Sequence, residues 1–255
     1  MNAYKFYYFS FFKECKYRKI RSLNIKFIKI LSDVCPIFVQ LSFVCFMTAV
    51  SIDFQMTTLS FLYMNSLLIH EEAVALFDDE IEQCKKFYNP KRKKTFIGVR
   101  HLRNTLEINK PIQYKSNGKP FLLNDNKCIS ISHTYDFVAF AVGDFPIGID
   151  IEKADRDASR IINKFVSDDE KNLYQAVKGN WPLELWCAKE AVYKLYDIPG
   201  LSFKDGIQIQ SRIQNKDAYQ LEGCIHLDGL NSTFMVRLVE EKGLLFAVAY
   251  FKAEL

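Results

Sequence analysis

The sequence lacks the cysteine and histidine patterns of disulfide-rich or zinc-binding proteins. Its seven cysteines are odd in number and widely scattered, with no C-x-x-C pair, and its four histidines are equally dispersed. This spacing argues against a disulfide framework and against a structural zinc site. Scattered cysteines are typical of a reducing compartment, so we expect a cytoplasmic protein.

The sequence also lacks a repeat of fixed period, a low-complexity linker and a basic body. Its formal net charge of +4 arises in residues 1–35, which hold eight lysines and arginines against Glu14 and Asp33. The other 220 residues hold 26 basic and 28 acidic side chains. This balance argues against a nucleic-acid-binding protein. Attraction of an anionic ligand must therefore come from local clusters of charge.

Residues 1–50 differ from the rest of the chain. A basic segment is followed by an apolar run at 36–50, which is too short for a convincing transmembrane helix. No small-x-small cleavage site follows it, which argues against a signal peptide. We interpret residues 1–50 as an extension outside the core, either an appended leader or the product of an upstream start codon, with the working protein beginning near Met47 or Met56. A membrane anchor is the less favoured alternative, and no membrane partner is expected.

The rest of the chain mixes helix and strand signals, and 255 residues suffice for one large domain or two packed halves. Amphipathic spacing, capping residues and a first-turn proline predict helices at 71–88, 90–106 and 156–165, after Ser167, and around 186–194. Alternating patterns predict strands at 57–69, 128–133, 135–142, 145–152, 206–210, 218–227, 233–240 and 244–252. Gly143-Asp144 is the predicted hairpin turn between two of these strands. The fold class is therefore α+β, with helices packed on antiparallel sheets.

The most informative segment is 147–152, where three isoleucines alternate with Gly148, Asp150 and Glu152. This period of two predicts a strand with one buried face. Asp150 and Glu152 then project from the same face, with their Cα atoms roughly 6–7 Å apart. Gly148 leaves room for a ligand or another backbone to approach.

A second segment, 186–194, is predicted to be a helix on which Glu190 and Lys194 lie one turn apart on one side. With Asp150 and Glu152, it supplies three carboxylates and a lysine. This set suits a hard cation that holds a phosphate. The alternative for Lys194 is an ordinary ion pair on the helix surface.

A third feature is a group of arginines on the helix predicted at 90–106. Arg92, Arg100 and Arg103 fall within an arc of about 80° at 3.6 residues per turn. This stripe is either solvated surface or part of an anion site.

Taken together, these segments resemble the 4′-phosphopantetheinyl transferases, and in particular the longer, surfactin-synthetase-activating type. The motifs that carry the resemblance occur in family order, from about residue 57 to residue 255. They are Arg92…Arg100, Gly118-Lys119-Pro120, Ser130-Ile131-Ser132-His133, Gly148-Ile149-Asp150-Ile151-Glu152, Phe165…Glu170 and Trp186-x-x-Lys189-Glu190-Ala191-x-x-Lys194. The resemblance implies two similar halves related by a pseudo-twofold axis, near 57–150 and 151–255, with coenzyme A in the cleft between them.

The implied activity is transfer of 4′-phosphopantetheine from coenzyme A to a serine of an apo acyl or peptidyl carrier protein, as in fatty acid biosynthesis. The reaction needs Mg²⁺ and releases 3′,5′-ADP. The resemblance implies that Asp150, Glu152 and Glu190 bind the metal. Glu190 is also the implied base for the serine, directly or through a metal-bound water, and Lys194 faces the pyrophosphate, where it stabilises or protonates the leaving group.

For coenzyme A, the resemblance places His133 and Arg92 near the 3′-phosphate and ribose, with Lys119, Ser132 and Arg100 as further helpers. A monomer is favoured. Two alternatives stay open: a non-catalytic coenzyme A or carrier-protein binding module that kept the fold, and a Mg²⁺-dependent phosphodiesterase that releases phosphopantetheine to water. Neither the carrier protein nor a preference for Mg²⁺ over Mn²⁺ follows from the sequence.

Overall fold

The computed structural model describes residues 48–54, 57–66, 69–215, 218–227 and 230–252, which all belong to the unit Met47–Leu255. Residues 1–47, most of the predicted extension, lie outside the described residues. Residues 48–50 begin strand β1 (Thr48–Phe54), which pairs with β2 (Thr57–Asn65). Of the described helices, none combines the length and the apolar character that crossing a bilayer requires.

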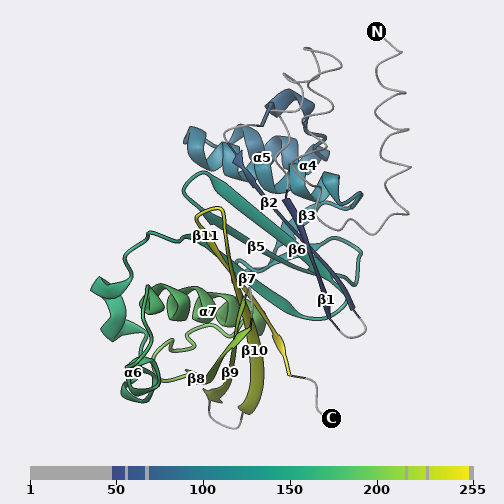
Figure 1. The fold of residues 1–255 in the computed structure, drawn as a ribbon. Coiled ribbons are helices and arrows are strands. Elements are labelled where there is room, and N and C mark those ends of the chain that lie inside the picture. Colours follow the sequence, from purple (N-terminus) through teal and green to yellow (C-terminus); the bar gives the residue numbers. More distant parts are fainter. Residues whose placement is uncertain (1–47, 55–56, 67–68, 216–217, 228–229, 253–255) are drawn as a thin grey trace. The chain divides into compact units, whose positions relative to one another are not determined.

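The first part of the fold is a four-stranded antiparallel sheet with the order β1-β2-β6-β5, where β5 spans Cys128–Thr134 and β6 spans Phe137–Gly143. Helices α4 (Asp78–Lys85) and α5 (Pro90–Thr105) lie on one side of this sheet, as Figure 1 shows. The Asn89 side chain accepts hydrogen bonds from two backbone N–H groups of the first turn of α5, and Pro90 occupies its first position. The short strands β3 (Ile112–Tyr114) and β4 (Pro120–Leu122) pair with each other.

The second part is a five-stranded antiparallel sheet with the order β7-β11-β10-β9-β8. Its strands are β7 (Ile147–Lys153), β8 (Ile207–Asn215), β9 (Ala218–Leu227), β10 (Leu230–Glu241) and β11 (Leu244–Phe251). The 3-10 helix η3 (Ser159–Lys164) and helix α6 (Asp168–Tyr174) precede the long helix α7 (Trp181–Tyr196). Helix α7 packs on β7, β11 and β10 and supplies much of the largest core cluster. The content of helices and antiparallel sheets is that of an α+β fold.

The structure corrects two predictions about elements. The helix predicted at 71–88 is interrupted, because it consists of the 3-10 turn η2 (Glu71–Ala73) and the separate helix α4. The predicted hairpin at Gly143-Asp144 is wrong, since β6 pairs with β2 and β5, whereas β7 pairs with β11. Both strands are almost continuously buried, so their local pattern could not select a partner.

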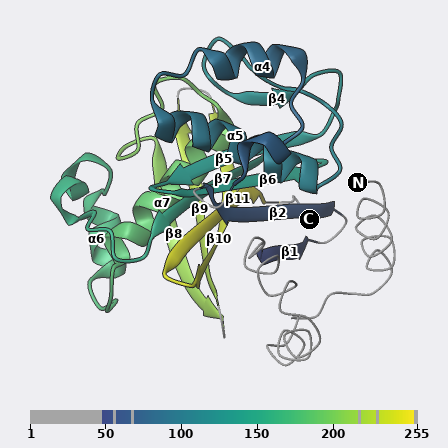
Figure 2. The ribbon, with the colours of Figure 1, turned by 90° about the horizontal axis from the view of Figure 1, so that it is seen from above.

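The two sheets meet where β5 and β7 run side by side, near the centre of Figure 2. Here serine hydroxyls of β5, rather than backbone carbonyls, accept hydrogen bonds from backbone N–H groups of β7. Ser130 Oγ accepts from the Ile149 N–H at 3.0 Å, and Ser132 Oγ accepts from the Ile151 N–H at 3.3 Å. Both serines are buried at this junction. The predicted boundary between residues 150 and 151 falls inside β7.

An apolar cluster spans the same junction. It joins two alanines of β6 to three isoleucines of β7 and three residues of β11: Ala139, Ala141, Ile147, Ile149, Ile151, Leu244, Phe246 and Val248. Because strands of both sheets contribute to it, this cluster ties the two parts of the fold into one core.

Candidate active site

The close approach of α7 to β7 depends on Gly148. A Cβ atom at this position would overlap the carbonyl oxygen of Ala191 and lie 2.6 Å from the backbone nitrogen of Leu195. The expectation that Gly148 admits another backbone is therefore confirmed, and that backbone is α7. Since Glu190 immediately precedes Ala191 and Lys194 immediately precedes Leu195, the contact brings both side chains close to Asp150.

Lys194 and Asp150 form the centre of the site. The Lys194 ammonium donates to Asp150 Oδ1 at 2.8 Å, to the Ile149 carbonyl at 2.9 Å and to Ser132 Oγ at 3.0 Å. The Ser132 hydroxyl in turn donates to the same Asp150 oxygen at 2.7 Å. Lys194 thus makes its ion pair across the α7–β7 contact, which differs from the alternative of a pair along the helix surface.

The second oxygen of Asp150 and the carboxyl of Glu190 complete the acidic part of the site. Asp150 Oδ2 is buried and has no hydrogen-bond partner among the described residues. Burial, and then the nearby charge of Asp150, raise the pKa of Glu190, while Lys194 and Arg156 act in the opposite direction. A cation between these acids would satisfy Asp150 Oδ2 and favour the ionised form of Glu190.

Glu152 is engaged by two neighbours. Its Oε2 accepts from the Thr134 hydroxyl at 2.8 Å, and its Oε1 pairs with the guanidinium of Arg156. The Arg156 guanidinium also lies over the Trp186 ring, 5.5 Å from the ring centroid. Glu152 is therefore held by β5 on one side and by the segment after β7 on the other.

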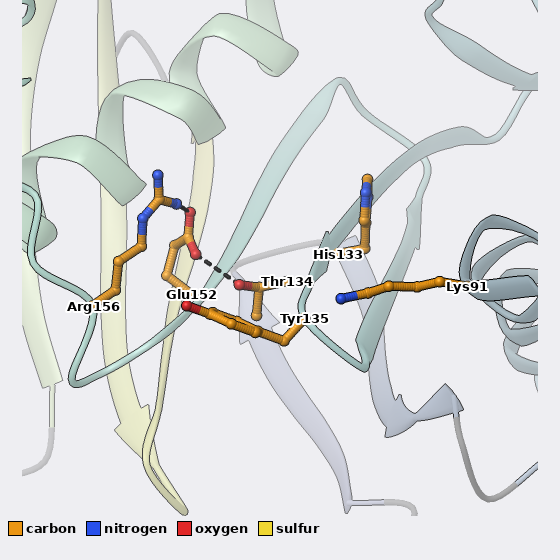
Figure 3. Close-up of a pocket in the computed structure, with 6 residues that line it drawn as sticks. All are labelled: Lys91, His133, Thr134, Tyr135, Glu152 and Arg156. Atoms are coloured by element: carbon orange, nitrogen blue, oxygen red, sulfur yellow. Dashed lines mark hydrogen bonds and ion pairs between the residues drawn. The ribbon is translucent and has the colours of Figure 1, made fainter. Parts of the chain in front are cut away.

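A pocket of about 470 Å³ opens beside Glu152, as Figure 3 shows. Its lining combines residues of both parts of the fold: Lys91, His133, Thr134, Tyr135, Glu152 and Arg156. Partial loss of water around the ring and the charge of Lys194 lower the pKa of His133, and Lys91 and Arg92 lower it further against the opposing effect of Asp150. The concentration of cations around His133 favours an anionic ligand at this end of the pocket.

Within the described residues, no three His, Cys, Asp or Glu side chains are gathered closely enough to hold a metal ion as they stand. The predicted ligands nevertheless fit a hard cation in their chemistry, because all three are carboxylates and Asp150 Oδ2 is a buried acceptor without a donor. Of these three carboxylates, Glu152 already forms an ion pair with Arg156. Binding of a cation by all three acids would place the cation in competition with Arg156 for Glu152.

The geometry of the β7–α7 contact agrees with a comparison against protein families. Residues 146–247 match the model of the 4′-phosphopantetheinyl transferase superfamily. The match begins next to β7 and ends within β11, so it contains Asp150, Glu152, Glu190 and Lys194. A search of curated proteins found no matching relative.

Arg92, Lys119 and Ser132, which the resemblance predicts as coenzyme A contacts, lie in different surroundings. Arg92 is exposed at the start of α5, near His133. Lys119 lies in the β3–β4 turn, with its ammonium 3.6 Å from the Asp197 carboxylate at the end of α7. Ser132 is buried and positions Asp150 and Lys194, so it is a support of the site rather than a wall of the pocket.

Arg100 is not part of the site, and its prediction as a coenzyme A contact is corrected. It is buried, with its Nε 3.2 Å from Glu80 Oε1 and its guanidinium 3.5 Å from the centroid of the Phe96 ring. Arg103 binds the same Glu80 oxygen at 2.6 Å. The arginine stripe therefore divides: Arg92 faces solvent, whereas Arg100 and Arg103 neutralise a buried glutamate.

Three residues that line the pocket, Thr134, Tyr135 and Arg156, are not among the site residues predicted from the sequence. Thr134 continues the alternation that places Ser130 and Ser132 toward β7, and this periodicity could have revealed it. Arg156 comes four residues after Glu152 and lies beyond the end of β7. Outside a helix or strand, this spacing does not predict a contact between the two side chains. Tyr135 has a positive φ of 48° in the β5–β6 turn, and a sequence gives no sign that a tyrosine will adopt this conformation.

Proposed function

We propose that this protein transfers 4′-phosphopantetheine from coenzyme A to a serine hydroxyl of an apo carrier protein and releases 3′,5′-ADP. The observation that carries the proposal is the meeting of Asp150, Glu190 and Lys194 at the α7–β7 contact, inside the region that matches the transferase superfamily. The adjoining pocket supports it, because its cations suit the phosphates of coenzyme A. The free state of the four described cysteines supports a reducing, cytoplasmic location.

Asp150, Glu152 and Glu190 would hold the Mg²⁺ ion. When bound, this ion neutralises the pyrophosphate and the charge that develops on the leaving oxygen. The orphaned oxygen of Asp150 supports this assignment, since a buried carboxylate oxygen without a donor costs free energy in the unloaded protein.

Glu190 is the proposed acceptor of the serine proton, either directly or through a water molecule. Its raised pKa supports the role, because a base whose pKa lies closer to neutral transfers protons more effectively at physiological pH. Lys194 is the proposed electrostatic partner of the leaving phosphate, which it stabilises or protonates. Its hydrogen bonds to Asp150, Ser132 and the Ile149 carbonyl fix the position of the ammonium in advance.

His133, Lys91 and Arg92 are proposed to bind the anionic nucleotide end of coenzyme A. His133 and Lys91 line one end of the pocket and Arg92 lies near His133, so an anion there would be attracted by the two cations and would accept a hydrogen bond from the imidazole. Lys119 stays a predicted contact at the edge of the site.

We also propose that the two parts of the fold are structural counterparts, as in a pseudo-twofold arrangement. Two buried glutamates support this. Glu80, at the third position of α4, accepts hydrogen bonds from the backbone N–H of Ile112 and from Arg100 and Arg103 of α5. Glu170, at the third position of α6, accepts hydrogen bonds from the backbone N–H of Ile209 and from the ammonium group of Lys189 on α7.

The test is incubation of the full chain with apo carrier proteins, Mg²⁺ and a fluorescent coenzyme A analogue. We expect a labelled carrier whose mass increases by the phosphopantetheine analogue, and we expect Glu190→Gln to abolish labelling while retaining the wild-type circular dichroism spectrum. Binding of coenzyme A with no transfer to any carrier, under conditions in which a known transferase labels them, would contradict the proposal and favour the binding module. Free 4′-phosphopantetheine formed without carrier would favour the phosphodiesterase.

A further inference from the structure

Arg156 lines the pocket and contacts the predicted metal ligand Glu152, but the proposed transfer reaction assigns it no role. It lies just after β7, and its guanidinium pairs with Glu152 on one side and lies over the Trp186 ring on the other. About one third of the side chain is exposed, against 8% for Glu152. Figure 3 shows the pair at one end of the pocket, opposite Lys91 and His133.

The two acids of β7 have different cationic partners. Asp150 is paired with Lys194, whose ammonium is fixed by three hydrogen bonds. Glu152 is paired with Arg156, and among the described residues Glu152 is the one hydrogen-bond partner of that guanidinium. Arg156 can therefore leave its carboxylate at a much smaller loss of contacts than Lys194.

A buried carboxylate without a partner is costly, so Arg156 stabilises Glu152 while no other cation is present. A divalent ion that takes Glu152 as a ligand competes with this pair. The released guanidinium stays beside the pocket, because the face of Trp186 attracts it independently of Glu152. Its planar donors then match the paired oxygens of a phosphate better than any other side chain in the pocket lining.

We propose that Arg156 is a mobile counter-ion that occupies Glu152 in the free protein and turns to the phosphates of coenzyme A when a divalent cation takes its place. This inference rests on the proposed function. In this scheme Arg156 contacts coenzyme A directly, and it makes the binding of metal and coenzyme A cooperative. Because coupling between two ligands is reciprocal, each should tighten the binding of the other by the same factor.

The experiment is titration of the full chain with Mn²⁺, with free Mn²⁺ followed by electron paramagnetic resonance, in the absence and presence of coenzyme A and without carrier protein. For wild type we expect coenzyme A to tighten Mn²⁺ binding by a factor within the usual range for coupled sites, about 5–150-fold. For Arg156→Gln we expect tighter binding of Mn²⁺ alone, since the competitor is gone, and a loss of most of the coenzyme A effect. Arg156→Lys keeps the charge without the planar donors, so it should bind Mn²⁺ alone like wild type and show a reduced coenzyme A effect.

Arg160→Gln is the matched control. It removes the same charge four residues further along the chain, from a side chain that is 89% exposed. Equal Mn²⁺ affinity in wild type and Arg156→Gln would overturn the counter-ion role and leave the proposed function intact, as would equal changes in Arg156→Gln and Arg160→Gln. Absence of Mn²⁺ binding in every protein, with and without coenzyme A, would instead overturn the proposed metal-dependent function itself. Circular dichroism and thermal unfolding establish that each variant is folded before titration.

Discussion

Ser132 shows how a single hydroxyl can organise the site at the meeting of two sheets. Its one proton goes to Asp150, and its lone pairs accept from the Ile151 N–H and from Lys194. Supporting hydrogen bonds of this kind typically contribute about 10–100-fold to metal affinity or activity. We therefore expect Ser132→Ala to lower kcat of carrier labelling by about 10–100-fold, with a smaller effect on KM for coenzyme A, because the residue does not line the pocket.

The matched control for this prediction is Ser130→Ala. Ser130 lies two residues earlier on the same face of β5 and accepts one hydrogen bond from the Ile149 N–H, with no bond to Asp150 or Lys194. It should keep kcat near the wild-type value. Equal losses of kcat in the two variants would mean that the serines act by holding the sheets together rather than by positioning the acid and the lysine.

Glu190 leads to a prediction about pH and stability. Its pKa is raised in the folded protein by burial and by Asp150, so the ionised form disfavours folding. Below its ordinary pKa of 4.5 the group is protonated in both the folded and the unfolded protein, and the penalty vanishes. Wild type therefore loses this part of its stability as the pH rises from 4.5 through the raised pKa.

Because glutamine does not titrate, we expect Glu190→Gln to unfold at a higher urea concentration than wild type at pH 7. The difference should shrink as the pH falls toward 4. Unfolding is measured by circular dichroism without divalent cations, and Glu72→Gln, an exposed glutamate, serves as the control with wild-type midpoints. Coincident midpoints of wild type and Glu190→Gln at pH 7 would contradict the prediction.

At the residue scale, the sequence predicts acids and glycine better than arginines. Asp150 and Glu152 follow from a short alternation, and the role of Gly148 follows from its missing side chain. Arg100 was misjudged because its partner Glu80 lies twenty residues earlier, and helical periodicity cannot report which side of α5 covers a buried carboxylate. The pairing of Arg156 with Glu152 depends on the path of the chain beyond β7, which local pattern does not define.

At the scale of elements, the contact between α7 and β7 predicts a strong effect of Gly148→Ala. The added methyl would overlap the backbone of α7, which cannot yield as a flexible side chain does. We expect a loss of about 3 kcal/mol or more in the free energy of unfolding, at the upper end of overpacking effects. Urea unfolding is the measurement.

Gly118→Ala separates this overlap from the loss of glycine's conformational freedom. Gly118 has a φ of +88°, and a Cβ there would meet no atom within 4 Å. Its replacement should cost about 1 kcal/mol from backbone strain alone. A destabilisation by Gly148→Ala no larger than that of Gly118→Ala would mean that α7 moves away from β7 with little effect on the core.

Helices with strong local signals are predicted from the sequence, whereas the pairing partner of strand β6 is not. Helix α5 begins at Asn89-Pro90 and helix α6 has the Ser167–Glu170 capping box, and the structure has both features. Strand β6 was paired with the wrong neighbour, because its apolar residues fit equally well beside β5, β2 or β7. Strand pairing depends on contacts between residues far apart in sequence, as in the apolar cluster that β6 shares with β7 and β11.

At the scale of the whole molecule, the question is whether the two sheets unfold together. The β5–β7 hydrogen bonds and the shared apolar cluster join them, which predicts a single cooperative transition of the unit Met47–Leu255. The two tryptophans, Trp181 and Trp186, both lie in α7 on the second sheet. Tryptophan fluorescence therefore reports on one part of the fold, whereas far-ultraviolet circular dichroism reports on both.

Glu80→Gln perturbs the other part. Glu80 is fully buried and pairs with both Arg100 and Arg103, and removing one member of a buried ionic group typically costs about 3–5 kcal/mol. We expect this variant to lower the urea midpoint by the same amount in fluorescence and in circular dichroism, although the substitution lies on α4 and the tryptophans on α7. Glu82→Gln, on the same helix but 64% exposed, should change the free energy of unfolding by less than about 0.5 kcal/mol. A fluorescence midpoint that stays at the wild-type value while the circular dichroism midpoint falls would mean that the sheets unfold separately, and that the β5–β7 junction is too weak to hold a site built from both of them.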